Sequence, residues 1–142
     1  MKKISILGST GFIGTSTLEI IAGFPERFKV VGLSAGRNIG RLSQQIQTFK
    51  PAVVSVHNPA LSEKLKELIP ANVSVEVLCD QSGMIKVATH PETDFVVSAM
   101  VGSVGVIPTM AAIQSGKRVA LANKETLIVA GRLIMEEARS HG

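Results

Sequence analysis

The sequence lacks tryptophan and tyrosine, and it has a single cysteine, Cys79. One cysteine forms no internal disulfide, which fits a reducing compartment, and we expect Cys79 to be a small core residue at the end of a strand. No apolar run approaches the ~20 residues of a membrane span, and the residues after Met1 fit neither a signal peptide nor a transit segment. These absences predict a cytoplasmic protein with no membrane partner.

The sequence also lacks a tract of lysine or arginine, although its formal net charge is +4. Its few aromatic residues do not interleave with basic ones, as they would in a surface that stacks nucleic-acid bases. A mildly basic surface suits a phosphate-rich small molecule, so we expect no nucleic-acid partner. His57, His90 and His141 share no metal-ligand spacing, and we expect no metal site in this chain.

What is present is a chain of 142 residues, 45% of them hydrophobic, which is the size and composition of one folded domain. Stretches typical of strands alternate along it with stretches of helical periodicity. The predicted strands are 3–8, 28–35, 52–56, 73–78, 94–99 and 117–122. We therefore expect a single α/β domain over residues 1–142, built from right-handed βαβ units.

Apolar residues at spacings of three and four predict three helices between these strands. Their apolar stripes are Ile13, Ile20, Ile21 and Phe24 in the first helix, Ile39, Leu42, Ile46 and Phe49 in the second, and Leu61, Leu65, Leu68 and Ile69 in the third. Gly23 and Pro25 end the first helix, while Asn58 and Pro59 begin the third. A further helix is expected over Arg132–Ser140.

The strands at Ile4–Leu7, Phe28–Leu33 and Phe95–Ala99 are almost continuously apolar. Such runs are typical of strands that are covered on both faces of a parallel sheet. The 73–78 stretch alternates valines with polar residues, which places it nearer an edge. The pattern predicts an α/β fold with a doubly wound, mainly parallel, Rossmann-like sheet.

A glycine-rich turn, Gly8–Gly14 with the sequence GSTGFIG, joins the first strand directly to the first helix. Its G-x-x-G-x-x-G spacing is a variant of the dinucleotide-binding fingerprint. Gly8 permits the tight turn, Gly11 lets a pyrophosphate approach the backbone, and Gly14 lets the helix pack on the strand. The positive end of the helix then faces the phosphates. A plain βα turn is the alternative, and the strand–turn–helix context favours the cofactor site.

The loop after the second strand, Ser34–Asn38, contains no acidic residue. NAD-specific sites usually place an acid about 20 positions after the glycines, on the ribose 2′-hydroxyl. Here Arg37 instead offers donors that match a phosphate, which favours NADP over NAD. The alternative for Arg37 is a solvated loop charge.

Two further predicted strands end in residues that suit a ligand. The 94–99 strand leads into a loop of small residues, and Ala122 at the end of the last strand precedes Asn123, Lys124 and Glu125. These three side chains suit hydrogen bonds to a nicotinamide ribose and an anionic substrate, with a helix cap as the alternative. All four motifs fall at the carboxyl ends of predicted parallel strands, where open α/β sheets bind ligands.

The glycine turn, the loop Ala35–Asn38 and the stretch Ala122–Leu127 together resemble the cofactor domain of the 1-deoxy-D-xylulose 5-phosphate reductoisomerase family. The resemblance covers essentially the whole chain. It implies an NADPH-dependent enzyme, homodimeric at full length, that rearranges this sugar phosphate with Mg or Mn. The enzyme then reduces the aldehyde intermediate to 2-C-methyl-D-erythritol 4-phosphate for isoprenoid synthesis.

The resemblance also implies a role for each matching position of this chain. Thr10, Gly11, Phe12 and Ile13 would contact the cofactor phosphates, and Gly36, Arg37 and Asn38 would hold the 2′-phosphate. Asn123 and Glu125 would contact the nicotinamide side of the cofactor, and Lys124 would contact the substrate. Phe12 departs from the serine that is usual in the family, so only a backbone contact is expected there.

The family's metal site, substrate-phosphate residues and mobile loop would follow Gly142. We therefore expect residues 1–142 to be a piece of a longer protein that binds NADPH but holds neither a metal nor a catalytic residue and is inactive alone. Two alternatives remain open. One is a stand-alone NADP(H)-sensing module, and the other is the cofactor domain of a homoserine or semialdehyde dehydrogenase.

Overall fold

A computed structural model describes residues 1–100 and 102–121, and strands and helices alternate throughout this part of the chain. The elements are β1 (Lys2–Leu7), α1 (Phe12–Ala22), β2 (Phe28–Ser34), α2 (Ile39–Phe49), β3 (Val53–Val56), α3 (Pro59–Leu68), β4 (Glu76–Cys79), α4 (Asp80–Ala88), β5 (Phe95–Ser98), α5 (Val106–Gln114) and β6 (Arg118–Leu121). A short 3-10 helix, Gly102–Gly105, precedes α5. All six predicted strands are present.

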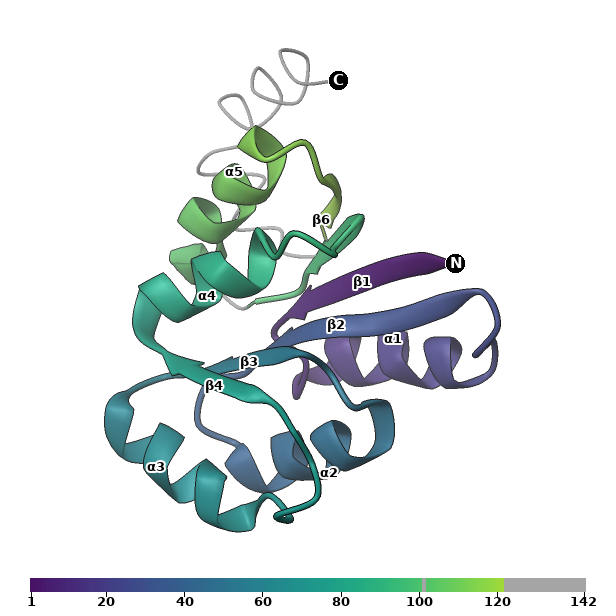
Figure 1. Cartoon of the computed structure of the whole chain (residues 1–142). Helices are drawn as coiled ribbons and strands as arrows, with labels where there is room; N and C mark the ends of the chain where they lie inside the picture. Colours follow the sequence, from purple (N-terminus) through teal and green to yellow (C-terminus); the bar gives the residue numbers. More distant parts are fainter. Residues whose placement is uncertain (101, 122–142) are drawn as a thin grey trace.

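The strands form one parallel sheet in the order β4-β3-β2-β1-β5-β6. Helices α1, α2 and α3 lie on one face of this sheet, and α4 and α5 lie on the other (Figure 1). The strand order reverses direction at β1, which pairs with both β2 and β5. The predicted doubly wound, Rossmann-like fold is confirmed, and the β1 carboxyl end is its topological switch point.

Each face of the sheet has its own apolar core. Leu18, Ile21, Leu42, Ile46 and Leu65 belong to the core under α1, α2 and α3. A second core joins α4 and α5 to the opposite face through Val87, Ala88 and Ala112. Neighbouring strand residues divide between the two, since Val54 and Val97 belong to the first core while Val53 and Val96 belong to the second. This division explains why the central strands are apolar at almost every position.

The prediction for the buried face of α1 is wrong in part. Three residues of the predicted stripe are exposed, Ile13 at 41%, Ile20 at 62% and Phe24 at 48%, whereas Gly14, Leu18 and Ile21 are buried. The face that packs on the sheet is set by Gly14, because only a residue without a side chain fits where α1 crosses the glycine turn. That constraint turns Leu18 and Ile21 inward and leaves Ile20 and Phe24 toward solvent.

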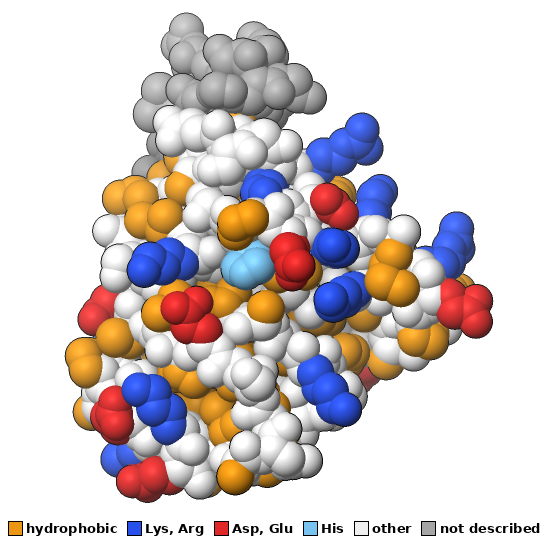
Figure 2. Space-filling model, viewed as in Figure 1, with side chains coloured by type: hydrophobic (Ala, Val, Ile, Leu, Met, Phe, Trp, Pro, Cys, Tyr) orange, Lys and Arg blue, Asp and Glu red, His pale blue; other side chains and the backbone are white. Residues whose placement is uncertain are grey.

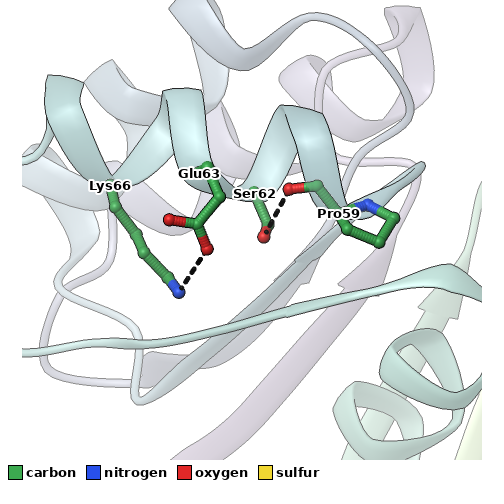
Figure 3. A network of polar contacts seen from close by, with 4 residues as sticks. All are labelled: Pro59, Ser62, Glu63 and Lys66. Atoms are coloured by element: carbon green, nitrogen blue, oxygen red, sulfur yellow. Dashed lines mark hydrogen bonds and ion pairs between the residues drawn. The ribbon is translucent and has the colours of Figure 1, made fainter.

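Helix α3 begins where the sequence predicts, and α2 begins at Ile39, the first residue of its predicted apolar stripe. The side-chain oxygen of Asn58 accepts the N–H of Leu61, and Pro59 is the first residue of α3. On this helix Ser62 Oγ donates to the Pro59 carbonyl at 3.0 Å, and Lys66 Nζ lies 3.1 Å from Glu63 Oε1 (Figure 3). Such an exposed ion pair contributes little, so the fully buried Leu65 is what holds α3 to the sheet.

The remaining differences concern one boundary and two helices. Strand β4 is an edge strand, as expected, but it begins at Glu76, because Val73 donates to the Pro70 carbonyl in a turn. No apolar stripe in the sequence predicted α4 or α5. The helix expected at Arg132–Ser140 lies outside the described residues. Within the described part of the chain, no helix has the length and hydropathy needed to cross a membrane.

Candidate cofactor site

The glycine turn between β1 and α1 is as tight as its sequence predicts. Gly8 has a φ of +87°, and a Cβ atom there would lie 2.7 Å from the carbonyl oxygen of Ala99, at the end of β5. A Cβ on Gly14 would overlap the Gly8 carbonyl oxygen and lie 2.7 Å from Ser9 Cα. A Cβ on Gly11 would meet only the Gly8 oxygen, at 3.8 Å. Two glycines are thus required by packing, while the third leaves space above the turn.

The N-terminus of α1 has no side-chain cap. Its N-cap residue is Gly11, and the N–H groups of Phe12, Ile13 and Gly14 donate to no acceptor among the described residues. Helices α2 and α3 are capped by Asn38 and Asn58, whereas α4 and α5 also lack a side-chain cap but do not follow the glycine turn. Uncapped N–H groups and the positive end of the helix dipole form a ready anion-binding site. The Phe12 side chain is 83% exposed.

Backbone and side-chain contacts fix this turn from two directions. The N–H groups of Gly8 and Ser9 both donate to the Ser34 carbonyl at the end of β2, at 2.8 and 2.9 Å. From α2, Gln45 Nε2 donates to the Ser9 carbonyl at 2.9 Å and Arg41 Nη1 donates to the Thr10 carbonyl at 3.3 Å. Neither Arg41 nor Gln45 was predicted from the sequence. Gln45 had a usable signal, because it is a polar residue on the buried face of α2.

The loop that follows β2 presents Gly36, Arg37 and Asn38 beside α2. Arg37 is exposed, and the Gly36 position is open, since a Cβ there would meet nothing within 4 Å. The Asn38 side-chain oxygen accepts the Arg41 N–H at 3.1 Å and so caps α2. Because the oxygen of this side chain is used for the cap, its NH2 group is the part that can donate to another group. The first turn of α2 contains no acid, although the helix dipole favours one there, and Arg37 and Arg41 flank this end instead.

A pocket of about 200 Å³ lies next to this loop at the carboxyl edge of the sheet. Its walls come from residues at the ends of β2, β3 and β5, from α4, which follows β4 directly, and from the short 3-10 helix. The lining residues are Ala35, Val56, His57, Asp80, Gln81, Met84, Met100 and Val104. Asp80 has a φ of +62°, a left-handed conformation that aspartate tolerates better than most residues. No motif in the sequence predicted this pocket.

The site residues expected after the last strand, Asn123, Lys124 and Glu125, lie outside the described residues. Over residues 1–100 and 102–121, no group of three His, Cys, Asp or Glu side chains is placed to hold a metal ion.

Lysine and arginine side chains on the face seen in Figure 2 are interspersed with acidic and apolar ones.

Cys79 lies at the end of β4, as the sequence predicts, but it is half-buried against the first core and not part of it. Desolvation by burial raises the pKa of its thiol, and the Asp80 carboxylate, 3.4 Å from Sγ, raises it further. Lys66 opposes the shift.

Because the thiolate is the reactive form, we expect Cys79 to be alkylated by iodoacetamide more slowly than a free cysteine at neutral pH. Asp80→Asn should lower the pKa of Cys79 and speed alkylation, since asparagine also tolerates the left-handed backbone at this position. Mass spectrometry of timed reactions measures both rates. Glu76→Gln removes a charge from the same strand without touching the thiol and should change nothing. Equal rates for the Asp80→Asn variant and the unsubstituted chain would contradict the role given to Asp80.

The fold and the turn define this chain as a doubly wound α/β domain that carries the glycine pattern of dinucleotide-binding proteins. The family model for 1-deoxy-D-xylulose 5-phosphate reductoisomerase matches residues 4–131. The chain belongs to this family. Membership excludes the homoserine and semialdehyde dehydrogenases that the sequence motifs left open.

Relatives and solved structures agree with this assignment. The 1-deoxy-D-xylulose 5-phosphate reductoisomerase of Geotalea uraniireducens is 50% identical over 142 residues, which are the whole of this chain and 36% of that protein. A crystal structure of DOX-P reductoisomerase in complex with NADPH, fosmidomycin and magnesium matches with a TM-score of 0.94 and 35% identity, over 100% of this chain and 35% of that one. The 1-deoxy-D-xylulose 5-phosphate reductoisomerase from Zymomonas mobilis in complex with NADPH matches with a TM-score of 0.93 and 36% identity, over 99% of this chain and 37% of that one. The chain thus spans about a third of the length of these relatives.

Proposed function

We propose that residues 1–142 are the NADPH-binding domain of an enzyme that converts 1-deoxy-D-xylulose 5-phosphate to 2-C-methyl-D-erythritol 4-phosphate. Family membership supports the reaction, and two relatives have been solved in complex with NADPH. The observation that carries the cofactor assignment is the uncapped N-terminus of α1 above the turn formed by Gly8, Gly11 and Gly14. Three N–H groups that have no acceptor over residues 1–100 and 102–121 lie at the switch point of a doubly wound sheet, and they fit a pyrophosphate.

The residues present fit each part of the cofactor. Thr10, Gly11, Phe12 and Ile13 hold the pyrophosphate through their backbone. Gly36, Arg37 and Asn38 hold the adenosine 2′-phosphate, since the guanidinium and the amide donate and the open Gly36 position admits the phosphate. The adjoining pocket, lined in part by Met84, Met100 and Val104, offers apolar surface to the adenine. Asn123 and Glu125 contact the nicotinamide side, and Lys124 contacts the substrate.

When bound, NADPH supplies the hydride for reduction of an aldehyde. This part of the chain binds and orients it: the N-terminus of α1 neutralises the pyrophosphate charge, and Arg37 selects for the 2′-phosphate. Lys124, by this assignment, places an anionic substrate beside the nicotinamide, because positioning supplies much of the rate in such reactions. In the full-length enzyme, Mg or Mn would be held by the part of the family's sequence that follows this chain, and it would supply polarisation of the substrate oxygens.

Calorimetric titration of the 142-residue chain tests the cofactor assignment. We expect NADPH to bind more tightly than NADH, because Arg37 takes the place of the acid that would favour an unphosphorylated ribose. Equal affinities, or no binding of either, would overturn the proposal.

Turnover tests the division of labour between the two parts of the enzyme. We expect no metal-dependent oxidation of NADPH by residues 1–142 with 1-deoxy-D-xylulose 5-phosphate. We expect activity once the downstream remainder of the family's sequence is present in the same polypeptide. Lys124→Ala in that longer chain should impair the reaction. Turnover by residues 1–142 alone would show that the active site has been misplaced.

A further inference from the structure

Two side chains of α2 hold the glycine turn by its carbonyl groups. Gln45 and Arg41 are one helical turn apart, and they donate to consecutive carbonyl oxygens, those of Ser9 and Thr10. The Gln45 side chain crosses from α2 to a residue 36 positions earlier in the chain. Neither side chain belongs to the cofactor contacts proposed above, so the pair needs another explanation.

The burial of these groups makes the Gln45 contact specific. Gln45 is 7% exposed and Ser9 is fully buried, and an amide in that environment is costly unless it is bonded. The Gln45 amide donates to the turn, while its own carbonyl oxygen and the Ser9 hydroxyl have no partner among the described residues. An apolar residue at position 45 would fill the same space without the unpaired carbonyl oxygen of Gln45, but it would leave the Ser9 carbonyl without its donor. The polar side chain is therefore retained for the bond that it makes to the turn.

We propose that Gln45 and Arg41 are positioning residues for the cofactor phosphates, and we call the pair the α2 clamp. This inference rests on the proposed function. By fixing the carbonyls of Ser9 and Thr10, the α2 clamp holds the planar peptide groups that contain the N–H of Thr10 and of Gly11. It thereby fixes the backbone that leads into the first turn of α1, so that the N–H groups of that turn point toward the pyrophosphate before it binds. The clamp also joins the turn to the helix that Asn38 caps, so the two phosphate sites share one rigid support.

Amide hydrogen exchange tests the clamp without any ligand. In Gln45→Met, which keeps the volume and removes the donor, we expect the N–H groups of Gly8 and Ser9 to exchange roughly tenfold faster. Exchange in the core strand β3 should be unchanged. Gln47→Met is the matched control, because Gln47 donates only to the Ser43 carbonyl of its own helix. Unchanged protection of Gly8 and Ser9 in Gln45→Met would overturn the inference whether or not the chain binds NADPH.

Binding tests the positioning role with three ligands. Gln45→Met should weaken the binding of NADPH and of NADH by the same factor, roughly three- to tenfold, because both cofactors carry the pyrophosphate. Adenosine 2′-monophosphate, which lacks it, should bind Gln45→Met and the unsubstituted chain equally. If Gln45 only supported the fold, its substitution would weaken the binding of all three ligands alike. That result, or unchanged affinity for all three, would contradict the positioning role of Gln45.

Arg41 provides a second variant that does not depend on core packing, because its side chain is exposed. Arg41→Met should weaken NADPH and NADH, and Arg41→Lys should recover most of the loss, since an ammonium group can still donate to Thr10. If Arg41→Met weakened the binding of NADPH but not of NADH, Arg41 would be a direct ligand of the 2′-phosphate. That result would overturn its place in the α2 clamp. If the unsubstituted chain binds no NADPH, the proposed function fails, while the exchange experiment still decides the clamp.

Discussion

Gly14→Ala is expected to abolish NADPH binding and to lower the free energy of unfolding substantially. The added methyl group would overlap the Gly8 carbonyl oxygen and press on Ser9 Cα, and these are backbone atoms that no rotamer change can move away. Overpacking of a tight site costs roughly 1–3 kcal/mol, and a backbone clash belongs at the upper end of that range. Thermal unfolding and calorimetric titration measure the two losses.

Gly11→Ala is the matched comparison for Gly14→Ala. Its Cβ would stand 3.8 Å from its nearest neighbour, the Gly8 oxygen, and the φ of −79° suits any residue. We expect stability within about 1 kcal/mol of the unsubstituted chain, the scale of a substitution at an N-cap. NADPH binding should nevertheless weaken, because the methyl group occupies the space above the turn. If both variants were equally stable, the close packing of α1 on the turn would be refuted.

Arg37→Ala is expected to weaken NADPH binding by roughly 10- to 150-fold, which corresponds to the loss of a charge-assisted hydrogen bond worth about 1.5–3 kcal/mol. NADH binding should be almost unchanged, because the guanidinium would contact only the 2′-phosphate. The exposed position of Arg37 makes the substitution harmless to the core. Titration of both cofactors at fixed ionic strength gives the ratio directly.

Arg27→Ala is the control for charge alone. Arg27 is also exposed, but it precedes β2 and so lies at the opposite, amino edge of the sheet from Arg37. Removing it changes the net charge by the same amount and should alter neither affinity. Equal losses for NADPH and NADH in Arg37→Ala would refute the assignment of the 2′-phosphate to this loop.

The sequence by itself determined the elements that depend on local pattern. Apolar residues at helical spacing predicted α2 and α3, and Asn58 with Pro59 predicted the first turn of α3, because capping involves residues only a few positions apart. The continuous apolar strands predicted a parallel sheet with two covered faces. The Gly8–Gly14 spacing located the turn, since the first and last of its glycines are required by the close packing of the βα junction itself.

Tertiary structure alone decided which face of α1 is buried and what holds the turn in place. The apolar residues of α1 allow more than one inward face, and the contact of Gly14 with Gly8 selects the one through Leu18 and Ile21. The bonds from Gln45 and Arg41 join positions more than 30 residues apart, and the pocket beside Ala35 gathers residues from four strand ends. No local periodicity encodes such contacts, because they exist only once the strands have taken their order in the sheet.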